Sequence, residues 1–369
     1  MIIILHISQA GGGVKTYIDN IAKYNPDKKS YKHYLISSKD YLTSEEFLFE
    51  KHYILPSFVR SPNLLKDIAA SKDIIKIIRE IKPDIIHCHS AKGGMHGRFA
   101  GFVLNIPTIF TPNAFSFLGY AGLKRKGFKK IESATKFKSY LLAVSNSESE
   151  RAIHEVGYNK NKVFTVDNYT EVSEIVNRNY ELKNKIGMIG RMTFQKNPLL
   201  FLKLAHHVSL ERPGIKFILL GAGYHDHLAS EVKAYIKEYN LVDVVEIKDW
   251  SYYSNIKEFY NSIDIFLLTS KFEGLSFSLL ESMSLGIPIV VTDADGNRDV
   301  INNKKNGYMS NDFSILKSCL LDLLKSQELR EEIGLAGHNH VFAFNSSKNA
   351  NKIYQLYASL VEHSSTGVS

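Results

Sequence analysis

Residues 264–292 read DIFLLTSKFEGLSFSLLESMSLGIPIVVT, two short apolar runs separated by a longer stretch of mixed character. The runs at 264–269 and 288–292 have the length and composition of buried strands, and a helix is predicted to begin near Ser276. Strands that are apolar along their whole length and alternate with helices are typical of a parallel sheet covered on both faces. This stretch therefore predicts a strand–helix–strand unit of an α/β fold.

The same alternation runs along most of the chain. Further strand-length runs lie at 2–7, 84–89, 108–111, 140–145, 162–166, 186–190, 216–221 and 243–247. A polar stretch at 170–185 interrupts the pattern, which then starts again. We therefore predict two doubly wound domains, at 1–168 and 185–345, with a linker at 169–184 and a last helix at 346–369 that is expected to pack back on the first domain.

The bulk composition bounds the class of protein. The chain has 369 residues, of which 44% are hydrophobic, enough for two substantial cores. No apolar stretch reaches the length of a transmembrane helix, and the start of the chain lacks the basic segment of a signal peptide. With only Cys88 and Cys319, far apart in sequence, we expect a cytoplasmic protein without a disulfide framework.

The formal net charge is +8, and the excess lies in the first half of the chain. Its densest stretch, GLKRKGFKKIESATKFK at 122–138, holds seven cations and is interleaved with Phe128 and Phe137. Such a stretch fits a nucleic-acid patch, a surface for anionic lipid or a solvated helix face.

Glycines and cations follow several of the predicted strands, where doubly wound folds bind their ligands. Gly11, Gly12 and Gly13 open a helix and would let backbone N–H groups approach an anion, although a plain tight turn explains them as well. In GRMTFQKNP, Arg191 and Lys196 suit the oxygens of a diphosphate, with surface cations as the alternative.

Two carboxylates lie eight positions apart in the opening stretch. Glu281 falls within an apolar run, so it requires a partner, either a protein cation or the hydroxyls of a ligand. Glu273 lies in the loop before the helix, and backbone N–H groups at 274–277 are available to an anion between the two acids.

Taken in order, five segments resemble the retaining GT-B glycosyltransferases of family 4. They are GGGVKT, KPDIIHCHSAKGGMHGRFAG, AVSNSESE, GRMTFQKNP and EGLSFSLLESMSLGIPIVVTDADGNRDVI, and together they span nearly the whole chain. The resemblance implies two Rossmann-like domains with a nucleotide sugar in the cleft between them.

The resemblance also implies roles for individual residues. Glu273 would hold hydroxyls of the donor sugar, Glu281 would hold the ribose, and Arg191 with Lys196 would stabilise the diphosphate leaving group. The remaining residues implied on the donor side are Gly12, Gly13, Gly223, Trp250, Gly274, Leu275 and Ser276. For Trp250 the alternative of a half-buried packing aromatic is slightly favoured.

On the acceptor side, Asn113 stands where many relatives carry a histidine, and asparagine cannot take up a proton. The resemblance places His89, Lys92 and Arg98 near the acceptor, with a core histidine and a structural ion pair as alternatives. His87 and His89 also suggest a metal site, but no acidic or thiol ligand nearby in sequence completes one.

We therefore predict an enzyme that moves a hexose or N-acetylhexosamine from a UDP-sugar to a lipid-linked saccharide in O-antigen or capsule synthesis, without a metal or other cofactor. It would bind the inner face of the plasma membrane through the cations Lys124, Arg125, Lys126, Lys129 and Lys130. The rival hypotheses are a nucleotide-sugar epimerase, a non-catalytic nucleotide-sugar-binding protein and a nucleic-acid-binding protein, for which no recognition motif is present.

Overall fold

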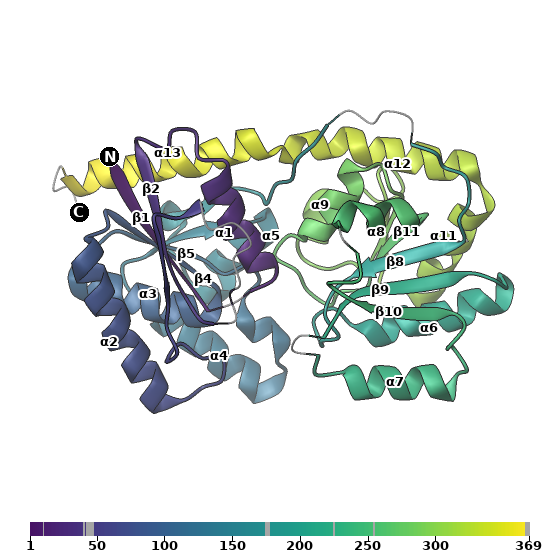
Figure 1. Ribbon diagram of the computed structural model, residues 1–369, viewed down its shortest axis with the longest axis horizontal. Coiled ribbons are helices and arrows are strands. Elements are labelled where there is room, and N and C mark those ends of the chain that lie inside the picture. Colours follow the sequence, from purple (N-terminus) through teal and green to yellow (C-terminus); the bar gives the residue numbers. More distant parts are fainter. Residues whose placement is uncertain are drawn as a thin grey trace. The chain divides into compact units, whose positions relative to one another are not determined.

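The computed structural model describes residues 1–9, 11–39, 41, 48–173, 178–223, 226–253 and 255–365. The chain forms two compact units (Figure 1). The first unit is Met1–Tyr169 together with Ser346–Ser369, and the second is Thr170–Asn345. Residues 174–177 of the predicted linker lie outside the described residues.

The first unit is built on a parallel sheet with the strand order β3-β2-β1-β4-β5-β6-β7. Its strands are β1 (Ile2–Ser8), β2 (Tyr31–Ser37), β3 (Lys51–Ile54), β4 (Ile85–His89), β5 (Thr108–Thr111), β6 (Tyr140–Ala143) and β7 (Val163–Thr165). Its α-helices are α1 (Gly13–Lys23), α2 (Leu64–Ile81), α3 (Ser90–Leu104), α4 (Gly122–Ala134), α5 (Asn146–Arg151) and α13 (Ser346–Ser365).

The second unit repeats this plan with the strand order β10-β9-β8-β11-β12-β13. Its strands are β8 (Lys185–Ile189), β9 (Lys216–Ala222), β10 (Val245–Asp249), β11 (Ile265–Leu268), β12 (Ile289–Val291) and β13 (Tyr308–Met309). Its helices are α6 (Pro198–Glu211), α7 (Ala229–Glu238), α8 (Ile256–Ser262), α9 (Phe277–Ser284), α10 (Asn297–Val300), α11 (Phe313–Lys325) and α12 (Gln327–Val341).

Both sheets reverse their strand order next to the first strand of the unit, between β1 and β4 and between β8 and β11. Ligands of doubly wound folds bind outside the carboxyl ends of the strands at such a switch point. The prediction of two parallel doubly wound sheets is confirmed. The loops after β8 and β11 carry Arg191, Lys196 and Glu273, so these side chains lie at the expected edge.

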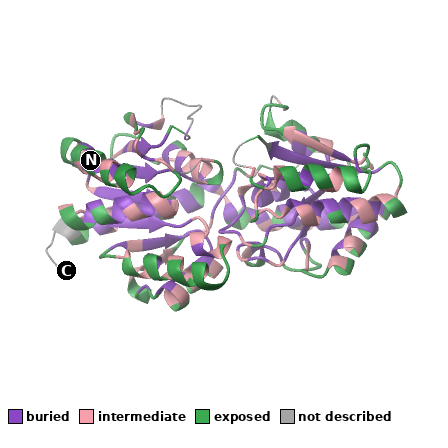
Figure 2. Cartoon of the chain, turned by 90° about the horizontal axis from the view of Figure 1, so that it is seen from below, coloured by how far each residue is buried: buried purple, intermediate pink, exposed green. Residues whose placement is uncertain are grey.

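The central strands of both sheets are buried along most of their length (Figure 2). Helix α3 lies unusually close to the first sheet because glycines face it. A Cβ atom on Gly93 would lie 2.5 Å from the carbonyl oxygen of Ile7, and one on Gly94 would lie 2.3 Å from Cε2 of Phe110. These glycines, at the predicted acceptor side, therefore permit close packing of helix on sheet.

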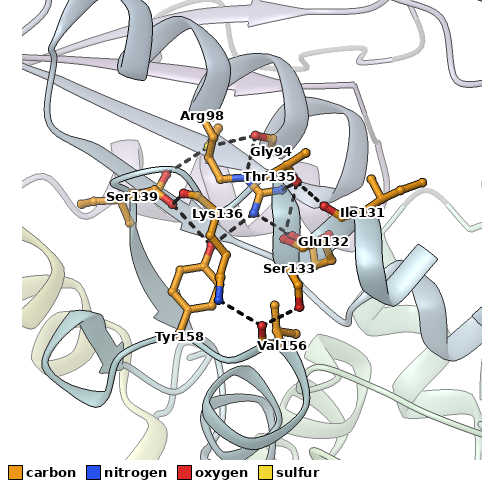
Figure 3. A network of polar contacts seen from close by, with 12 residues as sticks. Gly94, Arg98, Ile131, Glu132, Ser133, Thr135, Lys136, Ser139, Val156 and Tyr158 are labelled. Carbon is orange, nitrogen blue, oxygen red and sulfur yellow. Dashed lines mark hydrogen bonds and ion pairs between the residues drawn. The ribbon is translucent and has the colours of Figure 1, made fainter. Parts of the chain in front are cut away.

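Arg98 is held in a buried polar network between α3, α4 and the segment before β6 (Figure 3). Its Nη1 lies 2.7 Å from Oε1 of Glu132, and its guanidinium lies over the ring of Phe110. Of the two roles weighed for Arg98, the structure shows the structural pairing. The other role, a contact with the acceptor, does not fit a side chain that is only 1% exposed.

Replacing Glu132 with glutamine is expected to destabilise the first unit by about 3 kcal/mol, because a buried guanidinium would lose its counter-charge. Urea unfolding at neutral pH measures the change. Glu155→Gln is the matched control, since Glu155 pairs with Arg125 and Arg151 in a more exposed position and should shift stability by less than about 1 kcal/mol. Equal stability losses in the two variants would contradict the assignment.

Candidate functional site

The loops after β8 and β11 are joined through Glu273. Lys196 Nζ donates to Oε1 of Glu273 at 2.7 Å, and Gln195 Nε2 donates to Oε2 at 3.3 Å. Glu273 is only 7% exposed, so these contacts satisfy a largely buried carboxylate. The structure thus brings together Lys196 and Glu273, two of the predicted catalytic residues.

Backbone contacts fix this arrangement. The amide of Lys271 donates to the Gln195 carbonyl at 2.8 Å, and Gln195 Nε2 also donates to the Phe272 carbonyl at 3.2 Å. At the end of β11 the buried hydroxyl of Thr269 is within 3.0 Å of the Lys196 carbonyl. Sequence reasoning gave Gln195 and Thr269 no role, because their partners lie more than seventy residues away.

Asp226 connects the Arg191 loop to the loop after β9. Its Oδ1 accepts from the amide of Met192 at 2.7 Å, and its Oδ2 accepts from the amide of Gly223 at 2.6 Å. The backbone that carries Arg191 is therefore tied to Gly223, a predicted donor-side glycine. Asp226 is a further positioning residue that the sequence did not reveal.

Trp250 packs against Gly221, near the carboxyl end of β9. Gly221 has a φ of +118°, and a Cβ atom there would lie 2.8 Å from Cζ2 of Trp250. At Gly223 a Cβ atom would meet nothing closer than 3.9 Å. Because Trp250 remains 48% exposed, it combines a packed edge with a surface open to a ligand.

Glu281 lies on α9, as predicted, and finds its partner in Tyr260 of α8. The hydroxyl of Tyr260 donates to Oε2 of Glu281 at 2.6 Å. Burial raises the pKa of Glu281, and the hydrogen bond from Tyr260 opposes that rise. A carboxylate with one firm donor retains acceptor capacity for ligand hydroxyls.

Helix α9 begins as predicted, with Ser276 as its N-cap residue. Ser276 caps no backbone amide with its side chain, and its Oγ lies 2.9 Å from Oγ of Ser278. The turn before it is tightly packed, since Leu275 is 4% exposed and a Cβ atom on Gly296 would lie 2.3 Å from the Gly274 carbonyl oxygen. The start of α9 therefore presents backbone N–H groups in a fixed position.

In the first unit, Asn113 follows β5 in a strained turn. Asn113 and Ala114 have φ values of 53° and 74°, and the amide of Ala114 donates to Oε1 of the buried Glu148 at 2.7 Å. Nδ2 of Asn113 is buried without a partner in the described part of the chain. Strain and an unsatisfied donor often mark functional positions.

Gly12 and Gly13 lie at the start of α1, as predicted. Gly12 is the N-cap residue with a φ of +65°, and a Cβ atom there would meet nothing within 4 Å.

Lys92, predicted on the acceptor side, is already paired: its Nζ contacts Asp67 of α2 and donates to the Ser61 carbonyl at 3.2 Å. Its predicted role toward the acceptor stays a prediction.

His89 belongs to a cluster of four buried histidines between the first sheet and the helices α1 and α13. One ring nitrogen from each of His6, His87 and His89 lies within 4.8 Å of the others, which suits a metal ion. His87, however, already contacts Tyr357 Oη at 2.7 Å and Thr111 Oγ1 at 2.9 Å.

The remaining contacts fix the tautomers of the cluster. Tyr354 Oη lies 2.7 Å from the Ile21 carbonyl oxygen, which only accepts, so Nε2 of His33 must donate to Tyr354. His33 then accepts at Nδ1 from Nε2 of His6, which in turn accepts at Nδ1 from Nε2 of His89. These hydrogen bonds already engage the ring nitrogens that converge in the cluster. We therefore interpret the cluster as a polar core that holds neutral imidazoles.

Two family models match the chain. Residues 170–363 match the family described as glycosyl transferases group 1, and residues 11–174 match glycosyltransferase family 4. UDP-Gal:alpha-D-GlcNAc-diphosphoundecaprenol alpha-1,3-galactosyltransferase of Escherichia coli is 27% identical over 84% of this chain and 84% of its own length. The capsular polysaccharide biosynthesis glycosyltransferase CapM of Staphylococcus aureus is 23% identical over 85% and 86%.

Solved structures share the architecture. Sucrose-phosphate synthase of Thermosynechococcus elongatus superposes with a TM-score of 0.81 at 15% identity, over 98% of this chain and 99% of the other. Anabaena HepE, solved with UDP and glucose, gives a TM-score of 0.79 at 16% identity, over 96% and 99%. The fold described above is the GT-B fold of these proteins.

Proposed function

This chain belongs to the glycosyl transferases of group 1, and we propose that it moves a hexose or N-acetylhexosamine from a UDP-sugar to a lipid-linked saccharide. The Escherichia coli relative named above acts with UDP-galactose on a diphosphoundecaprenol-linked sugar, and CapM serves capsule synthesis. These relatives support a place in O-antigen or capsule assembly. The rival hypothesis of a nucleic-acid-binding protein has no such support.

The observation that carries the proposal is the contact of Lys196 with Glu273 at the carboxyl edge of the second sheet. Breaking the bond between sugar and diphosphate develops negative charge on the leaving oxygen. Lys196, Arg191 and the amides at the start of α9 would stabilise that charge, so the proposed reaction uses no divalent metal. Glu273 would hold sugar hydroxyls and Glu281 those of the ribose.

The proposed transfer retains the configuration of the sugar. In retaining hydrolases a second carboxylate attacks from the face opposite the leaving group, and the roles proposed for Glu273 and Glu281 leave neither of them for that step. We therefore propose that the acceptor hydroxyl attacks from the same face as the departing diphosphate. Asn113 can hydrogen-bond a hydroxyl but cannot take its proton, so a phosphate oxygen receives the proton.

Thermal-shift measurements with UDP, GDP, ADP and their sugars, each with and without magnesium, test the proposal. A rise in melting temperature with one nucleotide, independent of magnesium and larger with one of its sugars, is the expected result. The absence of a shift with every nucleotide would contradict it. Acceptor-dependent release of UDP then separates a transferase from an epimerase, which turns over donor alone, and from a protein that only binds.

We also propose that α4 holds the first unit on an anionic membrane. Its exposed face combines Leu123, 85% exposed, and Ile131, 53% exposed, with lysines such as Lys126. Phe128 is partly buried against the core of the first unit, and its ring stacks on that of Tyr120 with the centroids 4.4 Å apart. Within the described residues no helix is long and apolar enough to cross a bilayer.

Replacing the α4 cations by glutamine is expected to release the protein from vesicles that contain anionic lipid, since each exposed cation adds about 1 kcal/mol near such a surface. The residues replaced are Lys124, Arg125, Lys126, Lys129 and Lys130. A matched control replaces five cations of α2 and its end, Lys66, Lys72, Lys76, Arg79 and Lys82. Cosedimentation measures binding, and equal loss in both variants would show a general charge effect instead of a docking face.

A further inference from the structure

The carboxylate of Glu273 and the ammonium of Lys196 bind each other, yet the proposed function assigns them to different parts of the donor. Lys196 would meet the diphosphate, and Glu273 would meet hydroxyls of the sugar. Each of these contacts competes with the existing ion pair of 2.7 Å. A nucleotide that carries a sugar offers new partners to both charges of the pair, whereas a nucleotide without a sugar offers one only to Lys196.

Glu273 is largely buried, so its charge requires donors at all times. Its described hydrogen-bond donors are Lys196 and Gln195, and the contact with Gln195 is the longer one at 3.3 Å. When a sugar nucleotide binds, the sugar hydroxyls replace Lys196 as donors to Glu273, and Lys196 is released to the diphosphate. The exchange leaves both charges satisfied.

A nucleoside diphosphate without a sugar brings negative charge and no hydroxyls to Glu273. If Lys196 turns to the diphosphate, Glu273 keeps only Gln195, and a partly satisfied buried carboxylate is costly. If Lys196 stays with Glu273, the carboxylate remains paired, but the diphosphate binds without the cation that would neutralise its charge. Either arrangement weakens binding of the bare nucleotide.

We propose that the ion pair of Lys196 and Glu273 lowers the affinity for the nucleoside diphosphate product relative to the sugar nucleotide, and so favours product release. After transfer the sugar leaves with the acceptor, Glu273 recaptures Lys196, and the diphosphate loses its cation. Glu273 would then be both a sugar contact and the group that senses whether a sugar is present. This inference rests on the proposed function.

Titration calorimetry on the full chain, with UDP and with the UDP-sugar that gives the largest thermal shift, tests the inference. Glu273→Gln keeps the shape of the side chain and removes its charge, so Lys196 becomes available to UDP. The Kd for UDP is expected to fall about tenfold, the scale of a partly buried charge pair, while the Kd for the UDP-sugar stays the same or rises.

The matched control is Glu281→Gln, the same chemical change on α9 at a carboxylate that accepts a hydrogen bond from the neutral Tyr260. It is expected to bind UDP no more tightly than the unmodified chain. Glu273→Ala, which also removes the charge, provides a second variant if the glutamine variant fails to fold.

The outcomes separate the inference from the function on which it rests. If the unmodified chain binds no nucleotide, the proposed function fails. If it binds UDP and neither Glu273 variant binds UDP more tightly, the inference is overturned while the donor site stands. Tighter UDP binding in Glu281→Gln as well would also overturn it, because the effect would then be general electrostatics.

Discussion

Replacing Lys196 with alanine is expected to lower kcat for sugar transfer by about a hundred- to a thousandfold. The ammonium lies at the carboxyl end of β8, in a loop fixed by Thr269 and Gln195. A preorganised donor aimed at a developing charge contributes roughly this much to a barrier, because it needs no reorganisation during the reaction. The substitution also removes the cation that faces Glu273.

Initial rates at saturating donor measure this effect. Lys203→Ala is the matched control, because Lys203 lies further along α6, is exposed, and rests over the ring of Phe313. Its variant is expected to keep kcat within about twofold. A Lys196→Ala enzyme with near-normal kcat would remove Lys196 from the proposed reaction, whatever its effect on KM.

Lowering the pH from 7.5 to 5.0 is expected to destabilise the first unit strongly through its histidine cluster. Burial lowers the pKa of His33 and of His87 to about 3. Burial likewise lowers the pKa of His6 and His89 well below 6.5, helped by the charges that neighbouring histidines would carry. In the described part of the chain, the cluster is faced by the hydroxyls of Thr111, Tyr354 and Tyr357 and by the ring of Tyr17. None of these groups carries a negative charge that would stabilise a protonated histidine.

The direction of the stability change follows from the number of protons that the folded and the unfolded chain bind. Below about pH 6.5 the unfolded chain binds protons at these histidines and the folded chain does not, so stability falls as pH decreases. The stabilisation is fully present above pH 6.5 and is lost progressively toward the folded pKa values. At pH 5.0, His33 and His87 each account for about 2 kcal/mol, and His6 and His89 act in the same direction.

Urea unfolding followed by pulse proteolysis, which reports the two units as separate fragments, measures the loss. His33→Gln removes one of the titrating groups, so it should reduce the pH slope of the first unit between pH 6.5 and 5.0. His154→Gln is the control, because that side chain is 72% exposed and should leave the slope unchanged. A first unit whose stability is flat over this range would refute the interpretation of the cluster as neutral.

The two-unit parallel fold could be predicted because strands buried on both faces carry continuous apolar runs. Strand β2 was missed, since YKHYLIS places Lys32 and His33 in a strand. Their polar groups find partners only through the fold: Lys32 reaches Glu50, and His33 reaches His6 and Tyr354. Strand β13 has only two residues and offers no pattern to detect.

The donor-side residues were predicted from their places after strands and from resemblance, whereas the residues that position them were not. Gln195, Asp226 and Tyr260 are common polar types in unremarkable contexts. Their partners are 78, 34 and 21 residues away, so only the folded chain brings them together. The alternatives for Arg98 likewise could not be separated, because its partner Glu132 lies on another helix.

The first unit is made from two separated parts of the chain, and this affects folding during translation. The ribosome completes residues 1–169 first, but Tyr354 and Tyr357, which bind His33 and His87, arrive only after the whole second unit has been synthesised. At about 5–20 residues per second, the nascent sheet waits roughly 10–35 seconds for α13. During that time its histidine-lined face lacks the hydroxyls of Tyr354 and Tyr357 and the cover of α13. The unit whose synthesis begins first is therefore completed last. Its histidine-lined face would be the surface to which a chaperone of nascent chains binds.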